Sequence, residues 1–469
     1  MENLINTDEQ LHLKQYRMTH EPVKKLVCKL AVPTIISMLI TTIYNMADAF
    51  FVGMLNNTSA TGAVGVVFSL MSIIQAIGFF FGHGSGNFIS KQLGSNKEEE
   101  ASKMAATGFV CAFVTGIVIA VLGLSFLNTF ALMLGSTPTI LPYAKEYMFF
   151  ILLGTPFMTS SLVLNNQLRF QGSAKYAMFG ITAGGVLNIA LDPLFIFVFN
   201  MGIKGAAIAT LLSQIISFAL LFLGCRRKGN ISVKISNCVI SRRYLKEILR
   251  GGTPSLCRQG LQSVANVCLN FTAGIYGDPA IAAMTIVTKI MGFINSAVIG
   301  FGQGFQPVCG FNYGAKKYER VKEAFYFCVK VSTVFLLCVS AAAFALSPQL
   351  IALFRKGDEA VLEYGVSALR FQLATLTLTG WITMCNMMMQ NIGKVFKASA
   401  LAAARQGLFF IPLVFILPLF WNYLGVELAQ PIADIFTLLF SLPLQISVLR
   451  EINKKIAEQK LKSAEEIAI

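Results

Sequence analysis

The chain has 469 residues, of which 55% are hydrophobic and only 13% are charged, and its mean hydropathy is +0.65. A soluble domain carries about 25% charged residues, so this composition excludes a large soluble domain and indicates an integral membrane protein. The net charge of +15 would also suit a nucleic-acid-binding protein. The basic residues lie in short segments between apolar runs, however, so we expect no nucleic-acid partner.

Apolar segments long enough to cross a bilayer as helices recur along the whole sequence. Several contain proline, which a membrane helix tolerates where neighbouring groups or cavity water satisfy the freed carbonyl groups. The pattern predicts an all-α membrane protein with twelve transmembrane helices. The expected spans are residues 30–54, 60–86, 104–130, 142–168, 176–200, 204–225, 246–275, 280–307, 322–346, 362–388, 397–421 and 425–449.

The first span contains a carboxylate inside its apolar run. In AVPTIISMLITTIYNMADAFFVG (31–53), Pro33 lies near the start and Asp48 near the end. A carboxylate in a membrane helix costs several kcal/mol unless it faces the protein interior or a water-filled cavity. Asp48 is therefore a candidate functional acid. The alternative is a helix-end aspartate that reaches interfacial water.

A second acid lies in the fifth span, within GVLNIALDPLFIF. Asn188 and Asp192 are four residues apart, so they lie on one face of a helix. Amide and carboxylate oxygens are hard ligands that suit a small cation or a proton. The alternative is a hydrogen-bonded clamp between helices. Thr210 lies in the small, apolar sixth span, where its hydroxyl can join such a site or bond back to its own helix.

Other polar residues within the spans allow both functional and structural interpretations. His83 lies between glycines near the cytoplasmic end of the second span. The repeat described below has Gln303 at the equivalent position, so we expect His83 to shape a loop rather than relay protons. Charged side chains in the second half can snorkel, pair structurally or take part in transport. They are Arg258, Lys289, Arg370, Arg405 and Asp434.

The basic residues indicate the orientation in the membrane. Most lysines and arginines lie in the two terminal tails and in the loops that follow even-numbered spans. The opposite loops hold only Lys145, Lys204, Arg355 and Lys356. By the positive-inside rule we expect both termini in the cytoplasm. The long basic loop near 225–250 is then a cytoplasmic connector.

The two halves of the sequence resemble each other. Pro33 corresponds to Pro254 and Gly53 to Gly274 at one common shift, and residues 81–99 align with residues 301–319 at nearly the same shift. Six spans in each copy give both copies the same orientation, so we expect a pseudo-two-fold axis along the membrane normal with a cavity between the copies. The expected units are an N-terminal lobe (1–225), a cytoplasmic connecting loop (226–245) and a C-terminal lobe with a basic cytoplasmic tail (246–469).

The intramembrane acids are not repeated. At the shift that relates the two prolines, Asp48 corresponds to Leu269 and Asp192 to Leu413. A duplication that keeps prolines and glycines but not acids suggests that the two halves have different functions. We expect the first lobe to hold the coupling ion.

Taken together and in order, five motifs resemble the multidrug and toxic compound extrusion (MATE) transporters, in particular their MepA-like bacterial branch. The motifs are DAFFVG (48–53), LRFQG (168–172), NIALDPLFI (188–196), MGIKGAAIAT (201–210) and GQGFQPVCGFNYGAKK (302–317). The resemblance implies two six-helix lobes around a V-shaped cavity and antiport of organic cations against sodium ions or protons.

The resemblance also assigns roles to individual residues. It implies a cation-coupling site, for sodium or a proton, made by Asp48, Asn188, Asp192 and Thr210. It implies a helix bend at Pro33 and a polar cavity wall that includes Tyr44 and Asn165. Some branches use acids of spans 7 and 10 for sodium, but this chain has no central acid there, which argues against a second-lobe site of that type.

We therefore expect a monomeric antiporter of the cell membrane that exports amphipathic, often cationic small molecules and needs no cofactor beyond its coupling ion. One alternative is a lipid-linked precursor flippase of the same superfamily. A less favoured alternative is an intramembrane enzyme, but the sequence has no HExxH or GxSxG motif. The absence of a GxxxxGK[ST] nucleotide loop argues against an ATP-driven pump. We expect no enzymatic activity.

Overall fold

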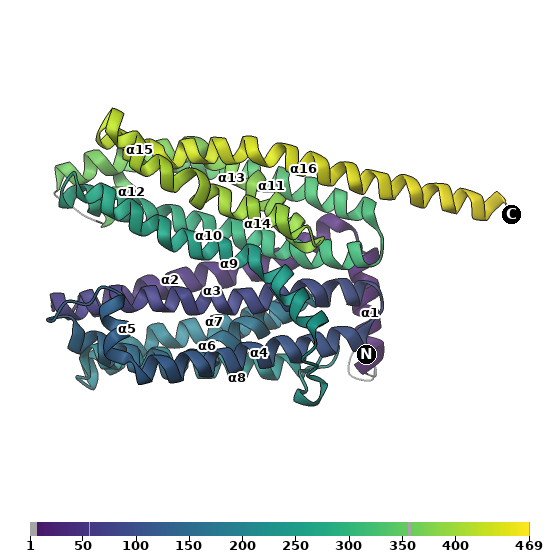
Figure 1. The fold of residues 1–469 in the computed structure, drawn as a ribbon, viewed down its shortest axis with the longest axis horizontal. Helices are drawn as coiled ribbons and strands as arrows, with labels where there is room; N and C mark the ends of the chain where they lie inside the picture. Colours follow the sequence, from purple (N-terminus) through teal and green to yellow (C-terminus); the bar gives the residue numbers. More distant parts are fainter. Residues whose placement is uncertain (1–6, 56, 355–357, 469) are drawn as a thin grey trace.

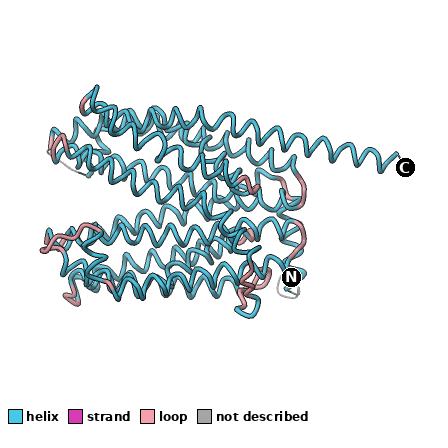
Figure 2. Tube along the Cα trace, in the orientation of Figure 1, coloured by secondary structure: helices cyan, strands magenta, loops and turns pink. Residues whose placement is uncertain are grey.

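The computed structural model describes residues 7–55, 57–354 and 358–468, and within them regular structure is helical throughout (Figures 1 and 2). Loops lie at the two ends of the bundle. The α-helices are α1 (Thr7–His20), α2 (Val23–Gly53), α3 (Thr58–Gly94), α4 (Glu98–Ser125), α5 (Leu127–Met133), α6 (Leu141–Phe170), α7 (Ala174–Pro193), α8 (Gly202–Cys225), α9 (Arg242–Gly274), α10 (Asp278–Gly314), α11 (Tyr318–Ala345), α12 (Ser347–Phe354), α13 (Glu359–Asn391), α14 (Val395–Ala403), α15 (Ile411–Trp421) and α16 (Tyr423–Ala468).

In the described residues, ten helical segments are long and apolar enough to cross a membrane. Helices α9 and α13, of 33 residues each, correspond to the other two expected spans but carry more polar residues. π-helical turns at Leu194–Val198 and Ala404–Phe410 continue α7 and join α14 to α15. The expected all-α membrane fold is confirmed.

Several helix ends differ from the expected spans. Helices α3 and α10 run to Gly94 and Gly314, well beyond the expected ends at 86 and 307. The expected span 104–130 is divided, because α4 ends at Ser125 and a short helix, α5, follows. The expected C-terminal tail is helical, since α16 continues to Ala468 and projects beyond the bundle (Figure 1). Arg355 and Lys356, assigned to an opposite loop, lie outside the described residues.

The helices form two groups. In Figure 1, α2–α8 lie in one group and α10–α16 in the other, and α9 leads from the first to the second. The groups meet where α2 packs on α10, α3 packs on α9 and α3 packs on α10. The first two pairs are equivalent to each other under the sequence repeat, which is the arrangement expected from a pseudo-two-fold axis.

Close glycine contacts show this symmetry at atomic detail. A Cβ at Gly94 of α3 would collide with the carbonyl oxygen of Phe311 in α10. A Cβ at Gly314 of α10 would collide with the carbonyl oxygen of Lys91 in α3. The two contacts are reciprocal, because the repeat relates Gly94 to Gly314 and Lys91 to Phe311. Only glycine allows the backbones to approach this closely.

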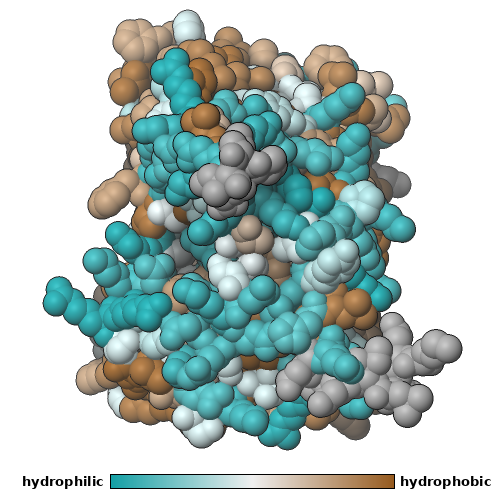
Figure 3. Space-filling model, turned by 90° about the vertical axis from the view of Figure 1, so that its right-hand side faces the viewer, coloured by the Kyte–Doolittle hydropathy of each residue, from teal (hydrophilic) through white to brown (hydrophobic). Residues whose placement is uncertain are grey.

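Helix α1 was not expected from the sequence, because its polar residues give no apolar run. It lies across the end of the bundle where both termini are found (Figure 1). Lys14 donates hydrogen bonds to Ser173 Oγ at 2.6 Å and to Asn230 Oδ1 at 2.7 Å. The backbone carbonyl of Met18 accepts from Asn312 Nδ2 of α10 at 3.1 Å. Hydrophilic side chains cover much of this end, with hydrophobic ones at its edges (Figure 3).

Candidate functional site

The polar residues of spans one, five and six converge in the first helix group. Asn188 of α7 donates through Nδ2 to Asp192 Oδ1 and to Thr210 Oγ1 of α8, at 3.3 Å each. Asp48 of α2 accepts a hydrogen bond at 3.0 Å from the hydroxyl of Tyr147 in α6. Asp48 interacts electrostatically with Asp192, and Tyr147 interacts with both acids. We call Asp48, Tyr147, Asn188, Asp192 and Thr210 the acidic cluster.

Three oxygens of the acidic cluster are buried without a hydrogen-bond partner in the described structure. They are Asp48 Oδ1, Asn188 Oδ1 and Asp192 Oδ2. Asn188 is 3% exposed and Asp192 is completely buried. A buried acceptor without a donor is costly, whereas a cation or proton among these oxygens would satisfy them. The cluster therefore offers the hard oxygen ligands that a small cation prefers.

The cluster resembles neither a transition-metal site nor a structural ion pair. Among the described residues, no group of three or more His, Cys, Asp or Glu side chains could hold a metal ion. The ion pairs found in those residues include neither Asp48 nor Asp192. Asp48 and Asp192 thus lack the cationic partner that a structural carboxylate normally has.

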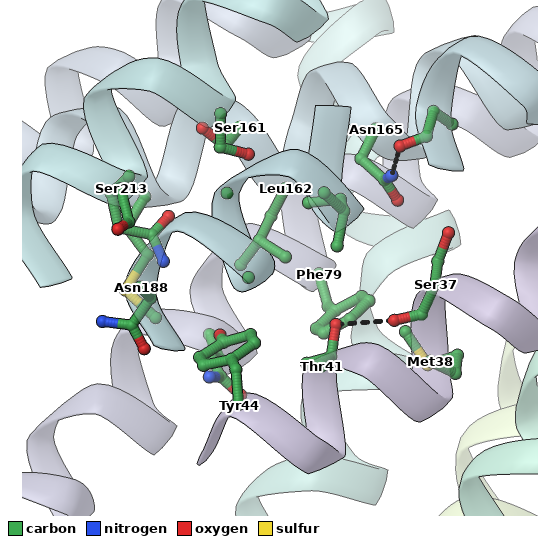
Figure 4. A pocket seen from close by; sticks show the side chains of 18 of the residues that line it. Ser37, Met38, Thr41, Tyr44, Phe79, Ser161, Leu162, Asn165, Asn188 and Ser213 are labelled. Atoms are coloured by element: carbon green, nitrogen blue, oxygen red, sulfur yellow. Dashed lines mark hydrogen bonds between the residues drawn. The ribbon is translucent and has the colours of Figure 1, made fainter. Parts of the chain in front are cut away.

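A cavity whose lining includes many polar side chains, called here the polar cavity, is drawn in Figure 4. Asn188 and Thr210 of the acidic cluster also line this cavity, and so do Tyr44 and Asn165, the two residues predicted for the cavity wall. Helices α2, α3, α6, α7 and α8 contribute almost all of the lining, and α10 contributes one residue, Gln303. Ser161 and Ser213 also line it, and their hydroxyls are buried and have no hydrogen-bond partner in the described structure.

Local packing fixes the two expected wall residues. A Cβ at Gly185 of α7 would lie 3.1 Å from Tyr44 Cδ1, so the glycine lets the tyrosine ring pack closely against α7. Asn165 donates through Nδ2 to the carbonyl of Ala177 at 3.1 Å. Asn386, its equivalent in the second half, makes the same bond to the carbonyl of Ala398 at 2.7 Å. Asn165 therefore has a structural role as well as a place in the wall.

Pro33 lies inside α2, which continues as one helix through it. Proline has no N–H group, so this turn lacks one backbone hydrogen bond and is a weak point of the helix. The contact with α10 is made beside it. Thr34 Oγ1 donates to the carbonyl of Gly300 at 2.6 Å, and a Cβ at Gly304 would lie 2.5 Å from Ala31 Cα.

A family model, MatE, matches the chain twice, at residues 33–194 and 254–416. The chain belongs to the MATE family. The two matches begin at Pro33 and Pro254, the same pair of prolines that the sequence repeat relates. Proteins of this family are transporters, so this MATE protein is a multi-pass membrane transporter and not an enzyme.

Relatives and solved structures agree with this assignment. The multidrug export protein MepA of Staphylococcus aureus is 27% identical over 430 residues, which cover 91% of this chain and 93% of that protein. A crystal structure of a MATE protein in complex with MaL6 has a TM-score of 0.89 at 26% identity and covers 93% of this chain and 99% of that chain. An outward-facing multidrug resistance MATE transporter has a TM-score of 0.88 at 26% identity, with coverages of 93% and 98%.

An apolar cleft separates α2 from helices α10–α12 of this MATE transporter. Ile43, Met46 and Phe50 line one side. Phe293 lines the other side, and Lys289 is the one charged residue among the lining residues described. The cleft can hold an apolar body, whereas the polar cavity offers hydrogen-bonding groups.

The other charged residues within spans have various partners. Arg405 donates through Nε to Asp434 Oδ1 at 2.8 Å, which makes a largely buried structural ion pair. Arg370 donates to Ser347 Oγ at 2.9 Å. Arg258 lies 3.5 Å from Asn386 Oδ1, its nearest described hydrogen-bond partner.

Sequence reasoning missed or misplaced three residues. It overlooked Tyr147, because a tyrosine near a span end is typical of the membrane interface. Arg169 counted as a basic loop residue, but α6 extends to Phe170 and Arg169 is only 1% exposed. The loop-shaping role expected for His83 is wrong, because α3 continues to Gly94 and His83 is buried in mid-helix. Its Nε2 lies 3.4 Å from Arg169 NH2.

Proposed function

We propose that this MATE transporter exports amphipathic, often cationic compounds in exchange for sodium ions or protons. In this proposal Asp48, Asn188, Asp192 and Thr210 bind the coupling ion. The carrying observation is the set of three buried oxygens of the acidic cluster that have no hydrogen-bond partner in the described structure. The names of the relatives, a multidrug export protein and a multidrug resistance transporter, support export of drug-like compounds.

The proposed mechanism links the ion to the shape of α2. Without a cation, the carboxylates of Asp48 and Asp192 repel each other in a buried site. A bound cation relieves that repulsion and allows α2 to move towards α7. Because Pro33 weakens α2, this movement can change the helix bend and shrink the polar cavity, so that substrate leaves as the cation enters. By linkage, the cation must bind one conformation more tightly, typically by about 1–3 kcal/mol.

The flippase alternative is less well supported. A lipid-linked precursor carries phosphates, which favour a cavity with several cationic side chains. The described lining of the polar cavity contains one cationic residue, Arg169, and that of the apolar cleft contains one, Lys289. The carboxylates of Asp48 and Asp192, which have no cationic partner among the described residues, favour ion-coupled export of small molecules instead.

We further propose that the protein works as a monomer in the cell membrane with both termini in the cytoplasm. We also propose that the N-terminal lobe ends at residue 225 and that the C-terminal lobe begins at residue 246. The basic residues of the terminal tails and of the loops after even-numbered spans support the orientation.

Transport by purified protein in proteoliposomes tests the function. Sodium and pH gradients should be imposed separately while efflux of a fluorescent organic cation against its own gradient is measured. One of the two gradients should drive uphill efflux, and its dissipation should stop it. If neither gradient drives efflux while passive exchange continues, ion-coupled export is wrong.

A further inference from the structure

The buried arginine Arg169 lines the polar cavity at the end nearest Gln303, which we call the inner end. Its guanidinium donates hydrogen bonds to Gln303 Oε1 of α10 and to Asn166 Oδ1, the latter at 2.5 Å. Its NH2 group lies 3.4 Å from His83, and its guanidinium lies 5.5 Å from the Phe170 ring centroid. The Nε–H group is buried and has no hydrogen-bond partner in the described structure.

None of these partners is a carboxylate. The ion pairs found among the described residues do not include Arg169. The charge that acts on it is a second cation, Arg258, whose described partner is the neutral Asn386. Buried arginines are normally paired with an acid, because an unpaired buried charge is strongly destabilising. The inner end of the cavity therefore has a cationic excess that an anion would neutralise.

The scaffold does not need this charge. The repeat-equivalent of Arg169 is Gln390, which is also buried. Gln390 donates to the carbonyl of Gly251 and to Ser255 Oγ, at 2.7 and 2.8 Å, and so joins its helix to α9. A neutral amide thus fills the same position in the second lobe. A positive charge at Arg169 calls for a different explanation.

The position of Arg169 in the cavity suggests an explanation for its charge. Gln303, its partner, contacts Met38 of α2, whereas Asp48 of the acidic cluster lies ten residues further along the same helix. Ten helical residues span about 15 Å, so Arg169 and the acidic cluster lie at opposite ends of the cavity, separated by roughly that distance, and Asn188 and Thr210 are the members of the cluster that line it. Ser161 and Ser213 also line the cavity.

We propose that Arg169 binds a carboxylate of the exported compound, so that this transporter favours amphipathic substrates that carry both an amine and a carboxylate. The proposal rests on the export function proposed above and specifies its substrate class. A monoanionic carboxylate matches the single cationic side chain in the described lining. The free Nε–H donates to it, and guanidinium–carboxylate geometry adds specificity.

Two dyes that differ in one group test the proposal. Tetramethylrhodamine is a zwitterion with a free carboxylate, and its methyl ester is a cation of nearly the same size. Affinities should be measured by fluorescence polarisation with the transporter in nanodiscs, and uphill efflux should be measured in proteoliposomes. We expect the wild type to bind the acid about tenfold more tightly than the ester, the scale of one charge-assisted hydrogen bond.

Variants separate a binding role from a structural one. Arg169→Gln should remove the preference for the acid and change ester affinity by no more than about twofold. Arg169→Lys, which keeps the charge, should retain part of the preference. Arg370→Gln is the matched control, because it removes an in-span arginine that bonds to Ser347 outside the cavity. It should leave the preference unchanged.

Three outcomes would overturn the proposal. They are equal affinity of the wild type for the two dyes, an equal loss of both affinities in Arg169→Gln, or no preference left in Arg169→Lys. If Arg169→Gln does not fold, the wild type and Arg169→Lys decide the question. Export of both dyes without a preference for the acid would refute only the role of Arg169. Failure to export either dye under any gradient would refute the export function itself.

Discussion

Asp192→Asn tests the coupling site with little disturbance of the fold. Asp192 Oδ1 accepts a hydrogen bond from Asn188, which an asparagine oxygen can keep, and Oδ2 has no described partner to lose. The free energy of unfolding should therefore change by less than about 1 kcal/mol. Removing the charge should remove most of the ion–conformation coupling. A coupling of about 1–3 kcal/mol corresponds to a factor of 5–150 in ion-driven accumulation.

Asp434→Asn is the matched control, because Asp434 is also a buried aspartate in a span. It pairs with Arg405 at 2.8 Å, so its neutralisation leaves a cation without its carboxylate. This should cost about 3–5 kcal/mol of stability but leave ion coupling intact in the protein that folds. The assay is the ratio of gradient-driven to passive dye exchange in proteoliposomes, with thermal unfolding measured on the same samples.

The two acids of the cluster should act as one unit. Asp48→Asn should abolish uphill efflux as Asp192→Asn does, and the double variant should be little worse than either single variant. Two results would refute the assignment of the coupling site. One is uphill efflux at the wild-type rate by the Asp192→Asn variant, and the other is a loss of coupling in Asp434→Asn but not in Asp192→Asn.

Three further predictions concern the packing, the cluster and the topology. Tyr147→Phe removes the hydrogen-bond donor to Asp48 and should lower, at least tenfold, the ion concentration that gives half-maximal efflux. An unchanged concentration would contradict a role for this hydrogen bond. Gly304→Val should destabilise the α2–α10 crossing by about 1–3 kcal/mol in thermal unfolding, and Gly292→Val, which has open space, should not. In a cysteine-free background, an impermeant thiol reagent should label Ser236→Cys only in inside-out vesicles and Thr139→Cys only in intact cells. The reverse pattern would contradict the proposed orientation.

The sequence was sufficient for most of the fold, because apolar runs of membrane length have few structural alternatives. It also indicated Asp48, Asn188, Asp192 and Thr210, since polar groups stand out in such runs and helical spacing places Asn188 beside Asp192. The unpartnered state of their oxygens could not be predicted. It depends on how α2, α6, α7 and α8 pack, which no local pattern encodes.

The failures have physical causes of the same kind. Helix α1 contains no apolar stripe strong enough to detect, and it is held by tertiary contacts such as those of Lys14. Arg169 looked like a loop residue because hydropathy alone does not show that α6 continues past it. Helix ends were missed at Gly94 and Gly314 because polar, glycine-rich turns remain helical when they pack closely against each other.

Comparison of equivalent residues in the two halves distinguishes structural residues from functional ones. Asn165 and Asn386 make the same hydrogen bond in the two halves, so this bond belongs to the scaffold. Arg169 and Gln390 occupy equivalent positions but differ in charge, and the acids of the cluster have no counterparts. Under the proposed mechanism, ion binding therefore changes the first lobe alone. The change can reach the second lobe only through helix crossings such as that of α2 and α10, where Pro33 lies beside the closest backbone contact.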